Sequence, residues 1–147
     1  MSVYFSNADV DFSLENTSLL KKWIFEVIKS YNKRLGRITY LFCSDEYVYN
    51  ANVKFLDHDT FTDIITFDYV EGDMISGDIL ISVDRVGENA KSFSPSFEQE
   101  LHRVIIHGVL HLLGFKDKTD ADAAVMRQKE NDSLSLLSAM FHEEQTI

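Results

Sequence analysis

The chain has 147 residues, a length that suits one domain, and its 45% hydrophobic and 12% aromatic content excludes a wholly disordered protein. Its 14 basic and 24 acidic side chains give a formal net charge of −10, which argues against a protein that coats nucleic acid without selectivity. A single cysteine, Cys43, excludes a disulfide framework and a zinc site built from several cysteines.

The predicted elements alternate between strands and helices and then continue as helices alone. Strands are expected at 3–5, 37–43, 64–69 and 79–83, and helices at 18–35, 44–55, 84–91, 94–113 and 119–141. The expected helix starts are Ser44, Ser94 with Pro95, and Thr119, and the expected helix ends are Gly36 and Gly114. This order predicts an α+β fold, a single domain over 1–147 in which a mixed four-stranded sheet is covered by about five helices.

No segment of the sequence predicts a membrane anchor. Residues 1–12 are acidic and lack the basic n-region of a signal peptide. The longest apolar stretch, residues 104–115, is interrupted by His107 and His111 and is too short to cross a bilayer. We therefore expect a cytoplasmic protein with no membrane partner.

The helix expected at 94–113 is apolar around most of its circumference, which predicts that it is buried. One narrow polar stripe follows it, formed by Glu100, Arg103, His107 and His111. The two histidines are four residues apart and therefore share a face. His102 lies off this stripe, and we interpret it as structural.

The spacing around the two histidines predicts a metal site. Gly114 follows His111 by three residues and can turn the chain back, and Asp117 follows by three more. Two imidazoles and one carboxylate suit Zn²⁺ with an open fourth position, and the same set could hold non-haem Fe(II). Two structural histidines are the alternative, and the added Gly114 and Asp117 favour the metal.

The residue after the first histidine argues against one class of metal-dependent enzyme, the metalloproteases. In the metalloprotease motif that residue is the glutamate base, whereas here it is Gly108. A protease that uses such a base is therefore not expected. Glu100 shares the face of His107 but lies about 10 Å along the helix axis, which favours a structural role over that of a base.

Several stretches resemble the YbeY family of rRNA-maturation endoribonucleases. The family signature H-G-x-L-H-L-x-G-Y-D-H resembles HGVLHLLGFKD at 107–117. The stretches T-D-V-L-S-F and G-D-I-x-I-S resemble residues 62–67 and 77–82. Asn52 with Phe55 resembles the family's L-N-x-x-Y stretch, and Glu100 also has its counterpart.

This resemblance implies a single-domain zinc-dependent endoribonuclease that acts on single-stranded RNA. It implies roles in maturing the 3′ end of the small-subunit rRNA and in ribosome quality control, with the ribosome or ribosomal proteins as partners. The catalytic and metal-binding residues that it carries over are His107, His111 and Asp117. One Zn²⁺ ion is the expected cofactor, and another divalent metal is the alternative.

The sequence departs from the family at two positions. Asp117 stands where the family has a third histidine, which keeps a competent ligand and can shift the metal preference. Leu56 stands where the family has an arginine. If that arginine contacts phosphate, Lys54 or His58 is the expected substitute. His58 is favoured because it lies in the loop that enters the 62–67 stretch.

A basic stripe gives a second candidate RNA contact. Six of the 14 basic residues fall between positions 21 and 37. On a helical wheel Lys22, Lys29 and Lys33 lie within about 40° of one another, opposite the apolar face. An ordinary solvated helix face is the alternative.

Two other functions stay open at this point. One is a metal-dependent hydrolase of a non-RNA phosphoester, and the other is a non-catalytic ribosome-associated factor with a structural metal. A structural zinc site has four protein ligands, whereas the arc that ends at Asp117 supplies three and Cys43 lies in a predicted core strand. An open, catalytic site is therefore favoured.

Overall fold

Four strands form one mixed sheet in the computed structural model, which describes residues 2–93 and 96–145. In chain order they are β1 (Ser2–Asn7), β2 (Arg34–Cys43), β3 (Ile64–Asp68) and β4 (Met74–Ser82). Their order across the sheet is β1-β2-β4-β3. The β1–β2 and β2–β4 pairs are parallel and the β3–β4 pair is antiparallel, which leaves β3 on an edge.

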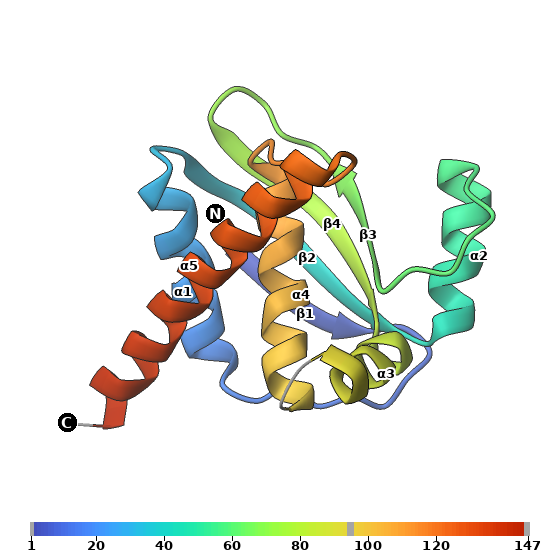
Figure 1. Cartoon of the computed structure of the whole chain (residues 1–147), viewed down its shortest axis with the longest axis horizontal. Coiled ribbons are helices and arrows are strands. Elements are labelled where there is room, and N and C mark those ends of the chain that lie inside the picture. Colours follow the sequence, from blue (N-terminus) through green and yellow to red (C-terminus); the bar gives the residue numbers. More distant parts are fainter. Residues whose placement is uncertain (1, 94–95, 146–147) are drawn as a thin grey trace.

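Five helices accompany the sheet (Figure 1). They are α1 (Thr17–Ser30), α2 (Asp45–Leu56), α3 (Val83–Phe93), α4 (Phe97–Leu112) and α5 (Asp120–Gln145). The helices α1, α4 and α5 lie over one face of the sheet, whereas α2 packs against β3 and β4 on the other face. The α+β class, the mixed four-stranded sheet and the number of helices therefore agree with the sequence prediction. No helix in the described ranges is long and apolar enough to span a bilayer.

Two apolar clusters hold these elements together. The larger one joins the sheet to α1, α4 and α5 through fully buried side chains such as Trp23, Tyr40 and Ile105. Buried polar atoms inside it are paired, since Trp23 Nε1 donates to Ser133 O at 2.8 Å and the Tyr40 hydroxyl donates to Ile105 O at 2.8 Å.

The smaller cluster joins α2 to the opposite face of the sheet. Val48 and Ala51 of α2 pack with Cys43, Ile65 and Leu80 of the strands. Cys43 is fully buried, and burial raises the pKa of its thiol to about 12, which agrees with the inert core role expected of it.

Helix ends follow local side-chain chemistry. Ser44 caps α2 by accepting a hydrogen bond from Tyr47 N at 3.1 Å, as predicted. Thr119 Oγ1 accepts from Asp122 N at 3.0 Å at the start of α5, also as predicted. The expected helix start at Ser94 and Pro95 lies outside the described residues, and α4 begins at Phe97 with Ser96 as its N-cap.

Two predicted boundaries were wrong. The first helix ends at Ser30 instead of Leu35, because Asn32 adopts a left-handed conformation with φ 60° and turns the chain into β2. Gly36 lies inside β2, where the side chains of Met74 and Ser76 leave no room for a Cβ atom. The fourth strand begins at Met74, five residues before the predicted start.

Candidate active site

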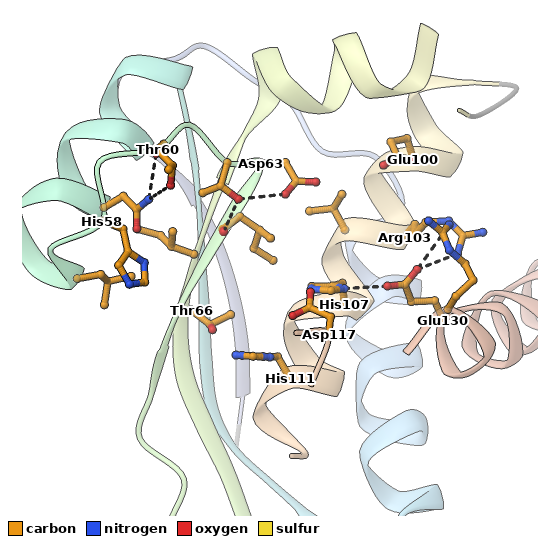
Figure 2. A pocket seen from close by; sticks show the side chains of 17 residues that line it. His58, Thr60, Asp63, Thr66, Glu100, Arg103, His107, His111, Asp117 and Glu130 are labelled. Atoms are coloured by element: carbon orange, nitrogen blue, oxygen red, sulfur yellow. Dashed lines mark hydrogen bonds and ion pairs between the residues drawn. The ribbon is translucent and has the colours of Figure 1, made fainter. Parts of the chain in front are cut away.

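A cavity of about 540 Å³ opens between α4, β3 and the segment that joins α2 to β3. His107, His111, Asp117, Asp63 and Glu130 are among its lining residues. They come from α4, from the turn after it, from the residue before β3 and from α5. Figure 2 shows His111 of α4 extending toward β3 across this cavity, whereas Arg103 is directed toward Glu130.

The narrow polar stripe of α4 supplies the site because the rest of that helix is buried. His107 is partly exposed and His111 is exposed, while Val104, Ile105 and Ile106 are buried in the core. The two imidazole rings are nearly parallel, at 8°, with their centroids 6.4 Å apart. The predicted shared face of the two histidines is therefore present.

Glu130 of α5 holds His107 in a defined orientation. His107 Nδ1 donates a hydrogen bond to Glu130 Oε2 at 2.8 Å, and Arg103 Nη1 donates to Glu130 Oε1 at 2.9 Å. Glu130 is only 5% exposed. Because Nδ1 is bonded to this carboxylate, His107 Nε2 is left to face the cavity. A carboxylate that accepts from one ring nitrogen of a metal-binding histidine orients the other nitrogen toward the metal.

Asp117 meets His107 at the mouth of the cavity. Gly114 has φ 106° and turns the chain back after α4, which brings Asp117 Oδ2 to 3.4 Å from His107 Nε2. Two ligands of a tetrahedral zinc ion lie about 3.3–3.5 Å apart. These two atoms therefore have the spacing that a shared metal requires, and the predicted turn at Gly114 is confirmed.

The third predicted donor does not complete this arrangement in the present conformation. Within residues 2–93 and 96–145 no three His, Cys, Asp or Glu side chains are gathered closely enough to hold a metal ion. His111 is exposed, and its ring must turn toward Asp117 for the set to close. The donor set fits zinc by its chemistry and, for the His107–Asp117 pair, by its spacing.

Glu130 and His107 each favour the charged form of the other, which shifts the pKa values of both. Burial alone would raise the pKa of Glu130, but hydrogen bonds from His107 and Arg103 outweigh it and lower that pKa. Burial alone would lower the pKa of His107, but the bond to Glu130 and the nearby carboxylates of Asp117 and Asp63 produce a net rise. Glu130 is therefore a charged carboxylate, and it stabilises the protonated form of the His107 ring.

Asp63 is a second carboxylate at this site. It lies just before β3, and Asn89 Nδ2 donates to its Oδ2 at 3.4 Å. Burial raises its pKa. A carboxyl group with a raised pKa is suited to exchanging a proton with a substrate.

Close packing explains the glycine between the two histidines. A Cβ atom at Gly108 would lie 2.9 Å from Ile79 Cδ1 and 3.1 Å from Ile64 Cδ1. No side chain as large as glutamate has room there. The absence of a protease-type base, inferred from the sequence, therefore has a structural cause.

The loop between α2 and β3 is fixed by Asn52. This residue is 2% exposed, and its Nδ2 donates to Thr60 O at 3.0 Å. The contact holds residues 57–62 beside the cavity, where His58 and Leu56 contribute to the lining. His58 therefore lines the same cavity as the histidine pair, across from it on the wall formed by this loop.

The other predicted RNA contacts lie elsewhere. Lys54 extends over the Phe55 ring, 5.2 Å from its centroid, and borders a different hollow on the opposite face of the sheet. Lys22 and Lys29 are exposed on α1, whereas Lys33 lies beyond the end of that helix, so the helical stripe predicted for the three lysines is wrong at Lys33. None of the three lines the cavity. His102 packs between Trp23 and Phe141, which agrees with its predicted structural role.

Four residues that the structure places at the site were missed from the sequence: Asp63, Thr66, Arg127 and Glu130. Glu130 and Arg127 lie in a helix whose charged positions look alike in the sequence, and only the packing of α5 on α4 selects them. Asp63 and Thr66 were noted only as part of the 62–67 stretch. The alternation of β3 could have shown that Ile64 and Thr66 share one face.

Comparisons with known proteins agree with this structure. A family model described as endoribonuclease YbeY matches residues 4–138. A protein named endoribonuclease YbeY from Flavobacterium johnsoniae is 53% identical over 139 residues, which cover 95% of this chain and 97% of that protein. A protein of the same name from Porphyromonas gingivalis is 51% identical, covering 88% of this chain and 91% of that protein.

A solved structure shares the fold. The solution structure of a Thermotoga maritima protein is similar with a TM-score of 0.64 and 26% identity, covering 98% of this chain and 92% of that one. The chain belongs to the YbeY endoribonuclease family, a family of hydrolytic enzymes. The family inferred from residues 52–117 is therefore confirmed.

Proposed function

We propose that this protein is a zinc-dependent endoribonuclease of the cytoplasm that cleaves single-stranded RNA. Its proposed roles are maturation of the 3′ end of the small-subunit rRNA and ribosome quality control, with the ribosome or ribosomal proteins as partners. The observation that carries the proposal is the 3.4 Å approach of Asp117 to His107 Nε2, with Glu130 bonded to the other nitrogen of the same ring.

The proposed metal ligands are His107, His111 and Asp117. A zinc ion held there supplies Lewis-acid chemistry, since it neutralises the negative charge that develops on a phosphate during cleavage. Glu130 keeps the proton of His107 on Nδ1 and so presents Nε2 to the cavity. Asp63, the carboxyl group with the raised pKa, is the proposed site of proton exchange with the substrate.

Arg127 and His58 are the proposed phosphate contacts of the cavity. Arg127 is 61% exposed and lies 3.8 Å from Glu130, so its guanidinium is available at the rim. His58 lies on the wall formed by the α2–β3 loop. Arg103 is held by Glu130 and Asn131, which suits it to positioning. Arginines placed at one cavity allow an acidic protein to bind RNA there.

Replacing His111 by alanine tests the proposal. This side chain is exposed, so the variant is expected to fold like the parent while losing bound zinc and at least 100-fold of its RNA cleavage rate. Metal content by mass spectrometry and cleavage of a single-stranded RNA are the two measurements. His142→Ala, at the far end of α5, is the matched control. Full cleavage by zinc-free His111→Ala would overturn the proposal.

A panel of substrates distinguishes the endoribonuclease from the main alternative, a hydrolase of non-RNA phosphoesters. If generic phosphodiesters are hydrolysed as fast as RNA by the parent protein, the site belongs to a phosphoesterase of broader scope. Faster cleavage of RNA than of DNA with the same sequence supports the endoribonuclease.

A further inference from the structure

The free edge of β3 borders the candidate active site, and its register determines which backbone groups point outward. Asp63 O accepts from Ser82 N at 2.9 Å, and Tyr69 N donates to Ser76 O at 3.0 Å. Hydrogen-bonded and non-hydrogen-bonded pairs alternate along an antiparallel ladder. Odd-numbered residues of β3 therefore bond to β4, whereas even-numbered residues direct their N–H and C=O groups away from it.

Thr66 is the even-numbered residue whose polar groups are all unpaired. It lies opposite Ile79 in the ladder, and no described residue forms a hydrogen bond with its backbone or its hydroxyl. It lines the same cavity as the histidines. Figure 2 shows the ring of His111 extending toward Thr66. An unpaired donor and acceptor thus stand beside the candidate metal ligands.

The neighbouring even-numbered residues do not extend this pattern. Ile64 O already accepts from the Thr62 hydroxyl at 3.3 Å. Asp68 does not line the cavity, so its outward backbone groups lie away from the histidines. An added peptide strand would need free groups at successive even positions. A ligand with one short hydrogen-bonding edge fits Thr66 better than an extended peptide.

We propose that the backbone N–H and C=O of Thr66 bind the Watson–Crick edge of one unpaired nucleobase next to the scissile phosphate. Each base carries a donor and an acceptor side by side on that edge, which matches the two groups that a single strand residue presents. The inference rests on the proposed endoribonuclease function and deepens it. A base in a duplex has this edge occupied, so Thr66 gives a physical reason for cleavage of single strands.

A scan with abasic nucleotides tests the contact on the intact protein. Single-stranded RNAs each carry one abasic nucleotide, placed at successive positions around the cleaved bond. We expect one position at which loss of the base lowers kcat/KM about tenfold, the size of one or two ordinary hydrogen bonds. A wild-type protein that shows no such position overturns the inference and leaves the endoribonuclease in place.

Three variants identify the partner of that base. Thr66→Pro removes the outward N–H and keeps the bonds to β4, because edge strands accept proline at such positions. It should lower kcat/KM on intact RNA about tenfold. It should also abolish the abasic penalty, which is the drop in kcat/KM caused by removing the base at the sensitive position. Thr66→Ala keeps the backbone groups and should retain the penalty. Asp68→Pro is the matched control, because it places a proline ring two residues further along β3 and outside the cavity. This variant should also retain the abasic penalty.

Other outcomes of these experiments would overturn the inference. A full abasic penalty in folded Thr66→Pro overturns the inference. If that variant does not fold, a 4-thiouridine at the sensitive position decides, since cross-linking to residues 64–68 supports the contact and cross-linking elsewhere overturns it. A wild-type protein that does not cleave RNA overturns the proposed function as well.

Discussion

At the scale of single residues, Glu130 is the most informative side chain of the site. It accepts hydrogen bonds from His107 and Arg103 while only 5% of it is exposed. A buried carboxylate is stable as an anion only when partners of this kind compensate for its lost hydration. Its two contacts therefore link the folding of α5 onto α4 to the orientation of His107.

Replacing Glu130 by glutamine is expected to weaken zinc binding about 10- to 100-fold. The amide oxygen can still accept from Nδ1, but it no longer supplies the negative charge that makes the imidazole a better ligand. Competition with a zinc chelator measures the affinity without any assay of cleavage. Asp132→Asn makes the same chemical change at an exposed position of α5 and should leave zinc affinity unchanged. Equal affinities of the parent and Glu130→Gln would contradict this role.

At the scale of elements, α1 combines two separate surfaces. Leu20, Trp23, Ile24 and Val27 bury one face in the core, while Lys22 and Lys29 are exposed on the opposite face and Lys33 follows the helix. The helix is therefore anchored independently of its charges. Those charges can change without loss of the fold.

Charge reversal of Lys29 and Lys33 tests the basic stripe. If the stripe contacts rRNA, Lys29→Glu with Lys33→Glu should weaken binding to ribosomal subunits and reduce the slope of log affinity against log salt by about 1–2. Filter binding at several salt concentrations measures both quantities. Lys91→Glu with Lys118→Glu changes the net charge equally on other segments and is the matched control. Equal effects of the two double variants would favour the solvated-face alternative.

Local chemistry made most elements predictable, and long-range contacts explain the exceptions. Ser44 and Thr119 carry capping side chains that act within three residues, so their helices could be placed from the sequence. The end of α1 depends on Asn32 in a left-handed conformation, which asparagine adopts without any obligatory sequence signal. The start of β4 depends on pairing with β2, some 40 residues away.

The site was predictable to the extent that it lies on one short stretch. Residues 107–117 gave the histidine pair, the turn and the carboxylate, because helical periodicity and one glycine determine their relative positions. Glu130 and Thr66 reach the same cavity from α5 and β3, and no local pattern marks either of them. Tertiary packing alone brings them to the histidines.

At the scale of the whole molecule, the core and the candidate metal site are largely separate. The larger cluster is built from apolar side chains of the sheet, α1, α4 and α5. The proposed ligands lie at its margin, where Asp117 is 47% exposed. The fold therefore has its own source of stability, unlike a small domain that folds only around its metal.

Removal of zinc should accordingly leave the protein folded. Circular dichroism in excess chelator is expected to match that of the zinc-loaded protein, and zinc at 100 times its Kd should raise the free energy of unfolding by about 2.7 kcal/mol. Urea titrations with and without zinc measure this difference, and His111→Ala should lack it. Unfolding by the chelator would instead favour the structural-metal alternative.

The turn at Gly114 has a consequence for how the family can diverge. It carries the chain out of the helix before Asp117, so the third donor belongs to an exposed segment that the core does not constrain. Exchange of an imidazole for a carboxylate at this place alters the charge of the site by about one unit and requires no repacking of the interior. The proposed metal site can thus change its third donor at position 117 while the interior of the protein stays as it is.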